Sequence, residues 1–233
     1  MRFLLSLFLM ATMGHLNLMA ETDAKEYKTY VKNNYKVFYC THEGVSVVVD
    51  PTEGGLFEPH ISIINNSGHE IMFEPKDIRA YAYAIPGNTV KSTRYRVGTY
   101  LDRGGDASRL ETDSLKIYTP KQYRKKQSRT NWWAMVLTEV VVAGVEQLGP
   151  QDDVTMMENA LYRRDRNNEF VKAHDEALKR IDEGYWKANT IFDGSEHQGF
   201  IAIKPVKTTY LILDIPVDGE MFHFVVDSKK YDE

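Results

Sequence analysis

Short apolar segments alternate with turn-forming clusters over the first part of the chain, from Tyr35 to Ile85. The segments are rich in β-branched and aromatic residues, and the turn clusters recur about every ten residues, a spacing that indicates an all-β fold. Val45–Val49 is one such segment, and it ends at Asp50 and Pro51. In Ile78–Ile85, tyrosine and arginine alternate with alanine, which predicts a strand with one large-residue face and one small-residue face.

Two pairs of apolar segments are separated by turn signals and are predicted to form hairpins. His60–Ile64 and Glu70–Phe73 flank an Asn-Asn-Ser-Gly link, whose residues favour chain reversal. Near the other end, Tyr210–Pro216 and Met221–Val226 flank a link that contains Asp-Gly, a strong signal for a two-residue hairpin turn.

The periodicity becomes helical at Thr119. This threonine is placed as an N-cap, with Pro120 at the first helical position and Gln122 able to complete a capping box. Gly149 and Pro150 form a stop signal, because glycine suits a left-handed cap and proline cannot continue the helix. The sequence therefore predicts a helix of roughly thirty residues, which is long for a globular protein.

A second helical stretch is predicted after this stop signal. Asp152 and Asp153 are suitable caps for a helix that starts at Val154. We expect an interruption at the Asn167-Asn168 pair and a second part that continues to Glu183, before a glycine. Val171, His174, Leu178, Ile181 and Tyr185 share one face of this helix, which predicts that His174 is partly buried within an apolar stripe.

The N-terminus has the pattern of a cleaved signal peptide. One arginine precedes an apolar run over residues 3–11, and Ala20 is a small residue placed just before a polar stretch. We expect residues 1–20 to be removed and the chain to be exported, to the periplasm or beyond. The single cysteine, Cys40, does not follow this cleavage point, so a lipid anchor is not expected, and it cannot form an intramolecular disulfide. In a predicted strand, it is expected to be a small buried hydrophobe.

The net charge of the chain is −4. This charge argues against nucleic acid as a partner, because proteins that bind nucleic acid usually carry a basic excess.

Taken together, the patterns predict a mainly β, antiparallel sandwich domain over residues 21–118 and 188–233, interrupted by a long α-helical insertion over residues 119–187.

Several strand-and-turn segments resemble those of uncharacterised secreted bacterial immunoglobulin-like domains. They are Ile61–Ser67, Phe73–Pro75, Thr190–Gly194 and Gly199–Ile201. The resemblance implies an immunoglobulin-like β-sandwich in a bacterial cell-envelope protein. It leaves the activity open, because fold does not determine function. The chain departs from the group at Asp193, where Pro-Gly is common in place of Asp-Gly, and in the length of its insertion.

Residues of the predicted insertion are the candidates for contact with a partner. Trp132 and Trp133 begin an apolar helical segment, in which Glu139 and Glu146 form a narrow polar stripe, as expected for a helix buried on most sides. The segment is too short and too charged for a membrane span. A basic cluster precedes it, comprising Arg124, Lys125, Lys126 and Arg129. Tryptophan and basic side chains together suit an anionic membrane surface or polysaccharide, whereas a purely solvated helix face is the simpler interpretation of the charges.

No familiar catalytic, metal or cofactor motif occurs in the sequence. It contains no Gly-x-Ser-x-Gly elbow, phosphate-binding loop, dinucleotide fingerprint or His-Glu-x-x-His pattern. The preferred hypothesis is therefore a non-catalytic binding or assembly module without a cofactor, with a protein or envelope partner or a second copy of the chain. Two alternatives remain open: a membrane-peripheral protein, and an enzyme such as a hydrolase, with a site built from His174, Glu139 or His60 where the insertion meets the sandwich.

Overall fold

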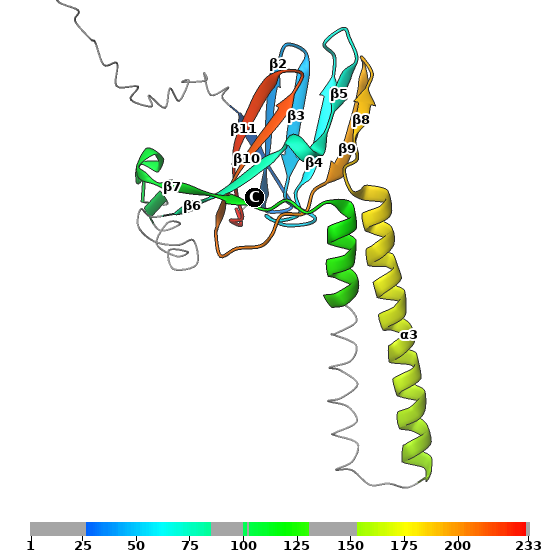
Figure 1. Cartoon of the computed structure of the whole chain (residues 1–233). Coiled ribbons are helices and arrows are strands. Elements are labelled where there is room, and N and C mark those ends of the chain that lie inside the picture. Colours follow the sequence, from blue (N-terminus) through cyan, green and yellow to red (C-terminus); the bar gives the residue numbers. More distant parts are fainter. Residues whose placement is uncertain (1–26, 85–99, 102, 131–152, 232–233) are drawn as a thin grey trace, which may run out of the picture.

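The computed structural model describes residues 27–84, 100–101, 103–130 and 153–231 of the chain (Figure 1). Over these residues the protein is mainly β, with eleven strands in antiparallel sheets. A helix over residues 120–130 and a second helix, α3 (Asp153–Gly184), lie between the strands in sequence. Both of these helices lie between β7 (Glu111–Leu115) and β8 (Asn189–Ile191) in sequence. We refer to strands β1 to β11 as the β body.

The β body contains two larger sheets and one small sheet. The first has the order β1 (Lys28–Lys32), β2 (Tyr35–His42), β3 (Val45–Asp50), β4 (His60–Asn65), β9 (Ser195–Phe200). The second has the order β11 (Glu220–Asp227), β10 (Tyr210–Val217), β6 (Arg79–Ala84), β7 (Glu111–Leu115). The small sheet pairs β5 (Ile71–Phe73) with β8 (Asn189–Ile191). Two short 3₁₀ helices, η1 (Pro75–Asp77) and η2 (Ala107–Arg109), lie in the connections.

One of the two predicted hairpins is confirmed and the other is wrong. β10 pairs with β11 across Asp218 and Gly219, whose φ angles of 54° and 79° fit a two-residue turn that matches the twist of its strands. The predicted pairing of the fourth and fifth strands does not occur: β4 pairs with β3 and β9, and β5 pairs with β8.

Asn65 provides the physical reason for this difference. Its buried side chain accepts a hydrogen bond from the Ser67 amide at 3.0 Å. Its Nδ2 donates to the carbonyl oxygens of His69, at 2.7 Å, and Ile191, at 2.9 Å. The side chain therefore turns the chain out of β4 and links the loop to β8, which is 126 positions away in sequence.

Both larger sheets contribute to one hydrophobic core. The buried alternation of β3 (Val45, Val47 and Val49) faces the buried residues of β10 and β11, and Ala80 and Ala82 of β6 are the small buried face that the alternation predicts. Cys40 is also buried, as expected. Trp186, directly beyond α3, is buried against Phe73 and donates from Nε1 to the Ile61 carbonyl at 2.8 Å.

The predicted start of the first helix is confirmed by its capping box. The Gln122 amide donates to Thr119 Oγ1, and the Thr119 amide donates to Gln122 Oε1, each at 3.3 Å. The predicted stop at Gly149 and Pro150 lies outside the described residues.

The expected interruption of the second helix at Asn167 and Asn168 is wrong, because α3 is continuous from Asp153 to Gly184. Asparagine lowers helix stability by only a fraction of a kcal/mol relative to alanine, roughly 0.5–0.7, which is too little to break a helix of this length. Its apolar stripe is buried at the end near the strands, at Ile181 and Tyr185, whereas Val171 is 52% exposed.

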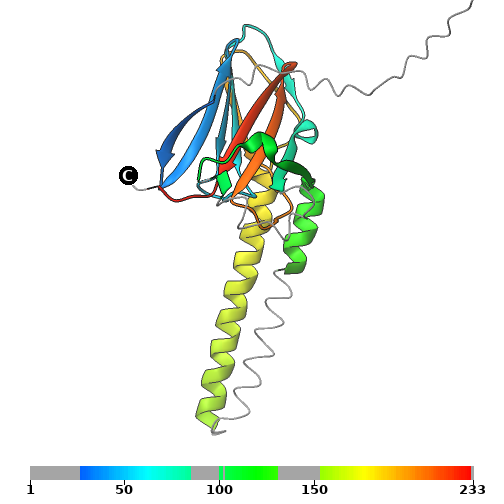
Figure 2. The ribbon, with the colours of Figure 1, turned by 90° about the vertical axis from the view of Figure 1, so that its left-hand side faces the viewer.

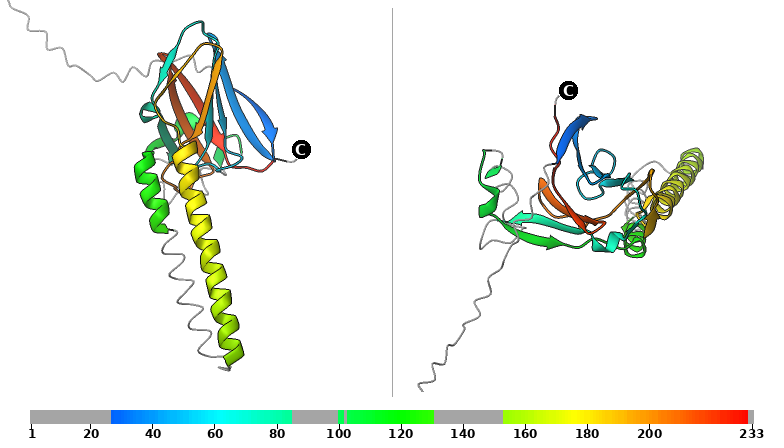
Figure 3. Two further views of the ribbon diagram at one scale, coloured as in Figure 1. Left: turned by 90° about the vertical axis from the view of Figure 1, so that its right-hand side faces the viewer. Right: turned by 90° about the horizontal axis from the view of Figure 1, so that it is seen from above.

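The helices leave the β body at one end. Figures 1 and 2 show the helix over residues 120–130 and α3 side by side, both directed away from the strands. The left panel of Figure 3 shows the same arrangement from the side opposite to that of Figure 2, and the right panel shows the molecule from above. We call the end of the β body from which the helices leave ‘the base’. The opposite end, which carries the β2–β3 and β10–β11 turns, is the apex.

Candidate anion-binding groove at the base

Glu58 anchors both helices to the base of the β body. Its carboxylate accepts a hydrogen bond from the Tyr123 hydroxyl, on the helix over residues 120–130, and one from Arg180 Nη1, on α3, at 3.2 Å. Gln127 Nε2 in turn donates to the Tyr123 hydroxyl oxygen. Burial and the bond to Glu58 raise the pKa of Tyr123, so its hydroxyl remains a donor at neutral pH.

An aromatic cluster fills the space beneath this anchor. Phe200 of β9 packs edge-on against Tyr123 and Tyr185, with ring centroids 6.3 and 5.1 Å away. The Tyr185 hydroxyl donates to the Tyr118 carbonyl and accepts from the Ala202 amide at 3.1 Å. The start of the first helix is therefore fixed relative to the strands.

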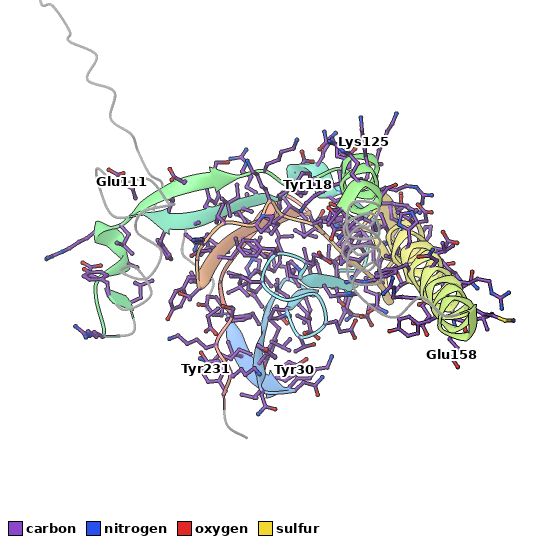
Figure 4. All side chains as sticks on the ribbon, turned by 90° about the horizontal axis from the view of Figure 1, so that it is seen from below. Tyr30, Glu111, Tyr118, Lys125, Glu158 and Tyr231 are labelled. Atoms are coloured by element: carbon purple, nitrogen blue, oxygen red, sulfur yellow. The ribbon has the colours of Figure 1, made fainter. Side chains whose placement is uncertain are left out.

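The helix over residues 120–130 presents different side chains to different neighbours. Tyr123 faces the β body, and Arg124 pairs with Asp182 of α3. Gln122, Lys125, Lys126 and Arg129 follow the i, i+3, i+4, i+7 spacing of a single helix face. Figure 4, viewed from below, shows Lys125 at the edge of this helix away from α3.

Lys116 reaches the same helix face from the segment between β7 and the helix. Ile117 forms a β-bridge with Ile203, and Lys116 and Tyr118 flank it. Because alternate residues of an extended segment share a side, the Lys116 and Tyr118 side chains project together. Two backbone hydrogen bonds hold the segment: Lys204 N to Lys116 O at 2.7 Å, and Tyr118 N to Ala202 O at 2.8 Å.

These side chains enclose a groove of about 450 Å³, which we call the basic groove. Its lining residues are Lys116, Tyr118, Gln122, Lys125, Lys126, Arg129 and Thr130. Four of the seven carry a positive charge, and none carries a negative charge. The volume is in the range of small-molecule binding sites. Such a lining attracts anions, because ammonium and guanidinium groups donate charge-assisted hydrogen bonds to phosphate, sulfate and carboxylate oxygens.

Tyr118 separates two of the cations. Lys126 Nζ lies 5.0 Å from the centroid of its ring and Lys116 Nζ lies 5.4 Å from it. Cation–π attraction holds an ammonium group near a ring face. The ring thus positions two positive charges at the wall of the groove.

The structure separates the residues of the predicted basic cluster. Lys125, Lys126 and Arg129 line the groove, whereas Arg124 pairs with Asp182. Lys116 joins the groove although it lies outside the sequence cluster; the available signal was its position three residues before the N-cap Thr119. Trp132, Trp133 and Glu139 lie outside the described residues.

The two histidines of the enzyme hypothesis are in different surroundings. His60 begins β4, with its ring 5.8 Å from that of Phe200 and its Nε2 3.5 Å from Glu53 Oε2. Burial lowers the pKa of His60, and the nearby Arg180 acts in the same direction. His174 precedes Arg180 by six residues, or about 9 Å along the helix axis.

Within the part of the chain that the structure describes, the helices do not combine the length and hydropathy needed to cross a membrane. Comparison with protein-family models, with curated proteins and with solved structures gave no match.

Proposed function

We propose that this chain is an exported, non-catalytic binding module that holds a polyanionic envelope molecule in the basic groove. In this proposal the β body is an immunoglobulin-like sandwich, and the helical insertion supplies most of the binding residues. The observation that carries the proposal is the convergence of Lys116, Lys125, Lys126 and Arg129 around one groove without a lining carboxylate. The chain as a whole is acidic, at −4, so this concentration of positive charge is local.

The spacing of the groove cations fits a chain-like anion. Lys125 and Arg129 are successive positions on one helix face, about 6 Å apart along the axis. That interval suits the repeated charges of a phosphate- or carboxylate-bearing polymer. Gln122 and Thr130 add neutral hydrogen-bonding groups for the units between the charges.

Calorimetric titration with inorganic polyphosphate tests this proposal. We expect saturable binding that weakens as salt is raised, because cations displace counterions from a polyanion. The double variant Lys125→Glu/Arg129→Glu is expected to lose at least about tenfold in affinity, equivalent to about 1.4 kcal/mol. Its control is Lys28→Glu/Lys172→Glu, which makes the same charge change at exposed positions outside the groove.

Two results would contradict the proposal. One is equal loss of affinity in the groove and control variants, which indicates a response to net charge alone. The other is binding to phosphatidylglycerol vesicles, but not to polyphosphate, with loss in the groove variant, which supports the membrane-peripheral alternative.

A further inference from the structure

Two tight turns meet at the apex, far from the basic groove. The β2–β3 turn contains Glu43 and Gly44, with φ angles of 45° and 82°. The β10–β11 turn contains Asp218 and Gly219 and has the same pair of left-handed conformations. Such two-residue turns leave little freedom for the residues that flank them. Glu220, the first residue of β11, follows the second turn directly and lies beside His42, the last residue of β2.

The β2–β3 turn is also packed against the loop after β4. The Asn66 amide donates to the Gly44 carbonyl at 2.8 Å. A Cβ atom at Gly44 would lie 2.3 Å from the Asn66 carbonyl oxygen, so the two backbones are in close contact. This contact fixes the position of His42 and Glu43 in the same way that the second turn fixes Glu220.

Three potential metal-binding side chains converge at this point. A ring nitrogen of His42 and one carboxylate oxygen each from Glu43 and Glu220 all lie within 4.8 Å of one another. His42 Nε2 is 3.8 Å from Glu43 Oε1. Metal–ligand bonds of about 2.0–2.2 Å imply donor separations of about 3.3–3.6 Å in a tetrahedral site. The Glu43 side chain is 77% exposed, so a change of rotamer can close the remaining gap.

We propose that His42, Glu43 and Glu220 form a binding site for a divalent transition-metal ion, of which Zn²⁺ is the representative. One imidazole nitrogen and two carboxylates are a mixed donor set of the kind that binds zinc, whereas calcium and magnesium prefer oxygen ligands throughout. Three protein ligands leave a fourth tetrahedral position for water or for a group on a partner. The ion joins β2 of the first sheet to β11 of the second, and so stabilises the contact between the sheets at the apex.

Calorimetric titration of the tag-free chain with ZnCl₂ tests the site. We expect one ion per chain and at least about tenfold weaker binding in His42→Gln and in Glu220→Gln, because each removes one of three ligands. The matched controls, His223→Gln and Glu111→Gln, change the same residue types outside the cluster and are expected to bind as the wild type does. Thermal unfolding is a second readout: zinc at about a hundredfold above its Kd is expected to raise Tm by about 5–10 °C in the wild type and controls only.

Several outcomes would overturn the inference. These are absence of saturable zinc binding, equal zinc affinity in wild type and both ligand variants, and displacement of zinc by equimolar Ca²⁺. Because all four variants replace partly or fully exposed side chains, their circular dichroism is expected to match the wild type. A loss of binding with preserved circular dichroism thus reports loss of a ligand.

Discussion

The ammonium group of Lys126 lies 5.0 Å from the centre of the Tyr118 ring, and the ring is shared with Lys116. This relationship connects a helix residue to the segment that precedes the helix. It places two cations from different elements on one wall of the groove. In the proposed binding mode, the ring positions these two cations and does not itself contact the anion.

Replacement of Tyr118 tests that role. Tyr118→Leu is expected to weaken polyphosphate binding by about two- to fivefold, because a cation–π contact at an exposed site is worth roughly 0.5–1 kcal/mol. Tyr118→Phe retains the ring and is expected to stay within about twofold of the wild type. Calorimetry measures both. A loss in Tyr118→Phe as large as that in Tyr118→Leu would show that the hydroxyl, and not the ring, determines binding.

Removal of the Glu58 carboxylate is expected to weaken the attachment of both helices. Glu58→Ala leaves the Tyr123 hydroxyl and Arg180 without this acceptor. The expected decrease in the free energy of unfolding is about 1–3 kcal/mol, the usual cost of a buried donor without its acceptor, which here is the Tyr123 hydroxyl. Urea denaturation measures it, with the exposed Glu70→Ala as control, expected to change stability by less than about 0.5 kcal/mol. Equal stability of the two variants would contradict the anchoring role.

His60 is expected to contribute to the pH dependence of the free energy of unfolding. Burial lowers the pKa of His60 below its ordinary value of 6.5, so the unfolded chain binds this proton more readily than the folded chain. Stability is therefore lost as pH falls from about 6.5 toward the folded pKa, and is retained above that window. Urea denaturation at a series of pH values is expected to show a smaller slope in His60→Gln. An unchanged slope would assign the pH dependence to other groups.

The close approach at Gly44 makes a further prediction about stability. Gly44→Ala and Gly55→Ala both place a side chain at positive φ, at 82° and 71°, but only the first meets another backbone. Gly55→Ala is expected to cost about 1–2 kcal/mol, the usual penalty of the left-handed conformation. Gly44→Ala is expected to cost more, because the turn must also move away from Asn66. Urea denaturation measures both variants. An equal decrease in the free energy of unfolding would show that the loop at Asn66 moves away from the new side chain without loss of stability.

Local signals predicted the elements of this fold better than their pairing. Asp218-Gly219 determined its hairpin because the turn itself requires left-handed residues, and Thr119 with Gln122 marked a helix start through mutual hydrogen bonds. The partner of β5 was not predictable in the same way, since it depends on Asn65 reaching Ile191 across 126 positions. The basic cluster was visible in sequence. Two further features depend on how the helices pack: the position of Lys116 in the lining of the groove, and the pairing of Arg124 with Asp182.

The apex cluster illustrates the same limit. His42 and Glu43 are neighbours in sequence, but Glu220 is far from them along the chain. Only the packing of two turns from different sheets brings their side chains together. Spacing rules for metal ligands therefore gave no signal for this site.

The salt dependence of polyphosphate binding tests the central claim most directly, because it counts the cations that engage the ligand. If all four groove cations bind phosphates, the slope of log K against log salt is expected to be about −2.8, by analogy with single-stranded nucleic acids. In Lys125→Ala/Arg129→Ala it is expected to fall to about −1.4, with two cations left. A slope that is the same in the variant and the wild type would contradict the account, since the anion would then bind elsewhere on the protein.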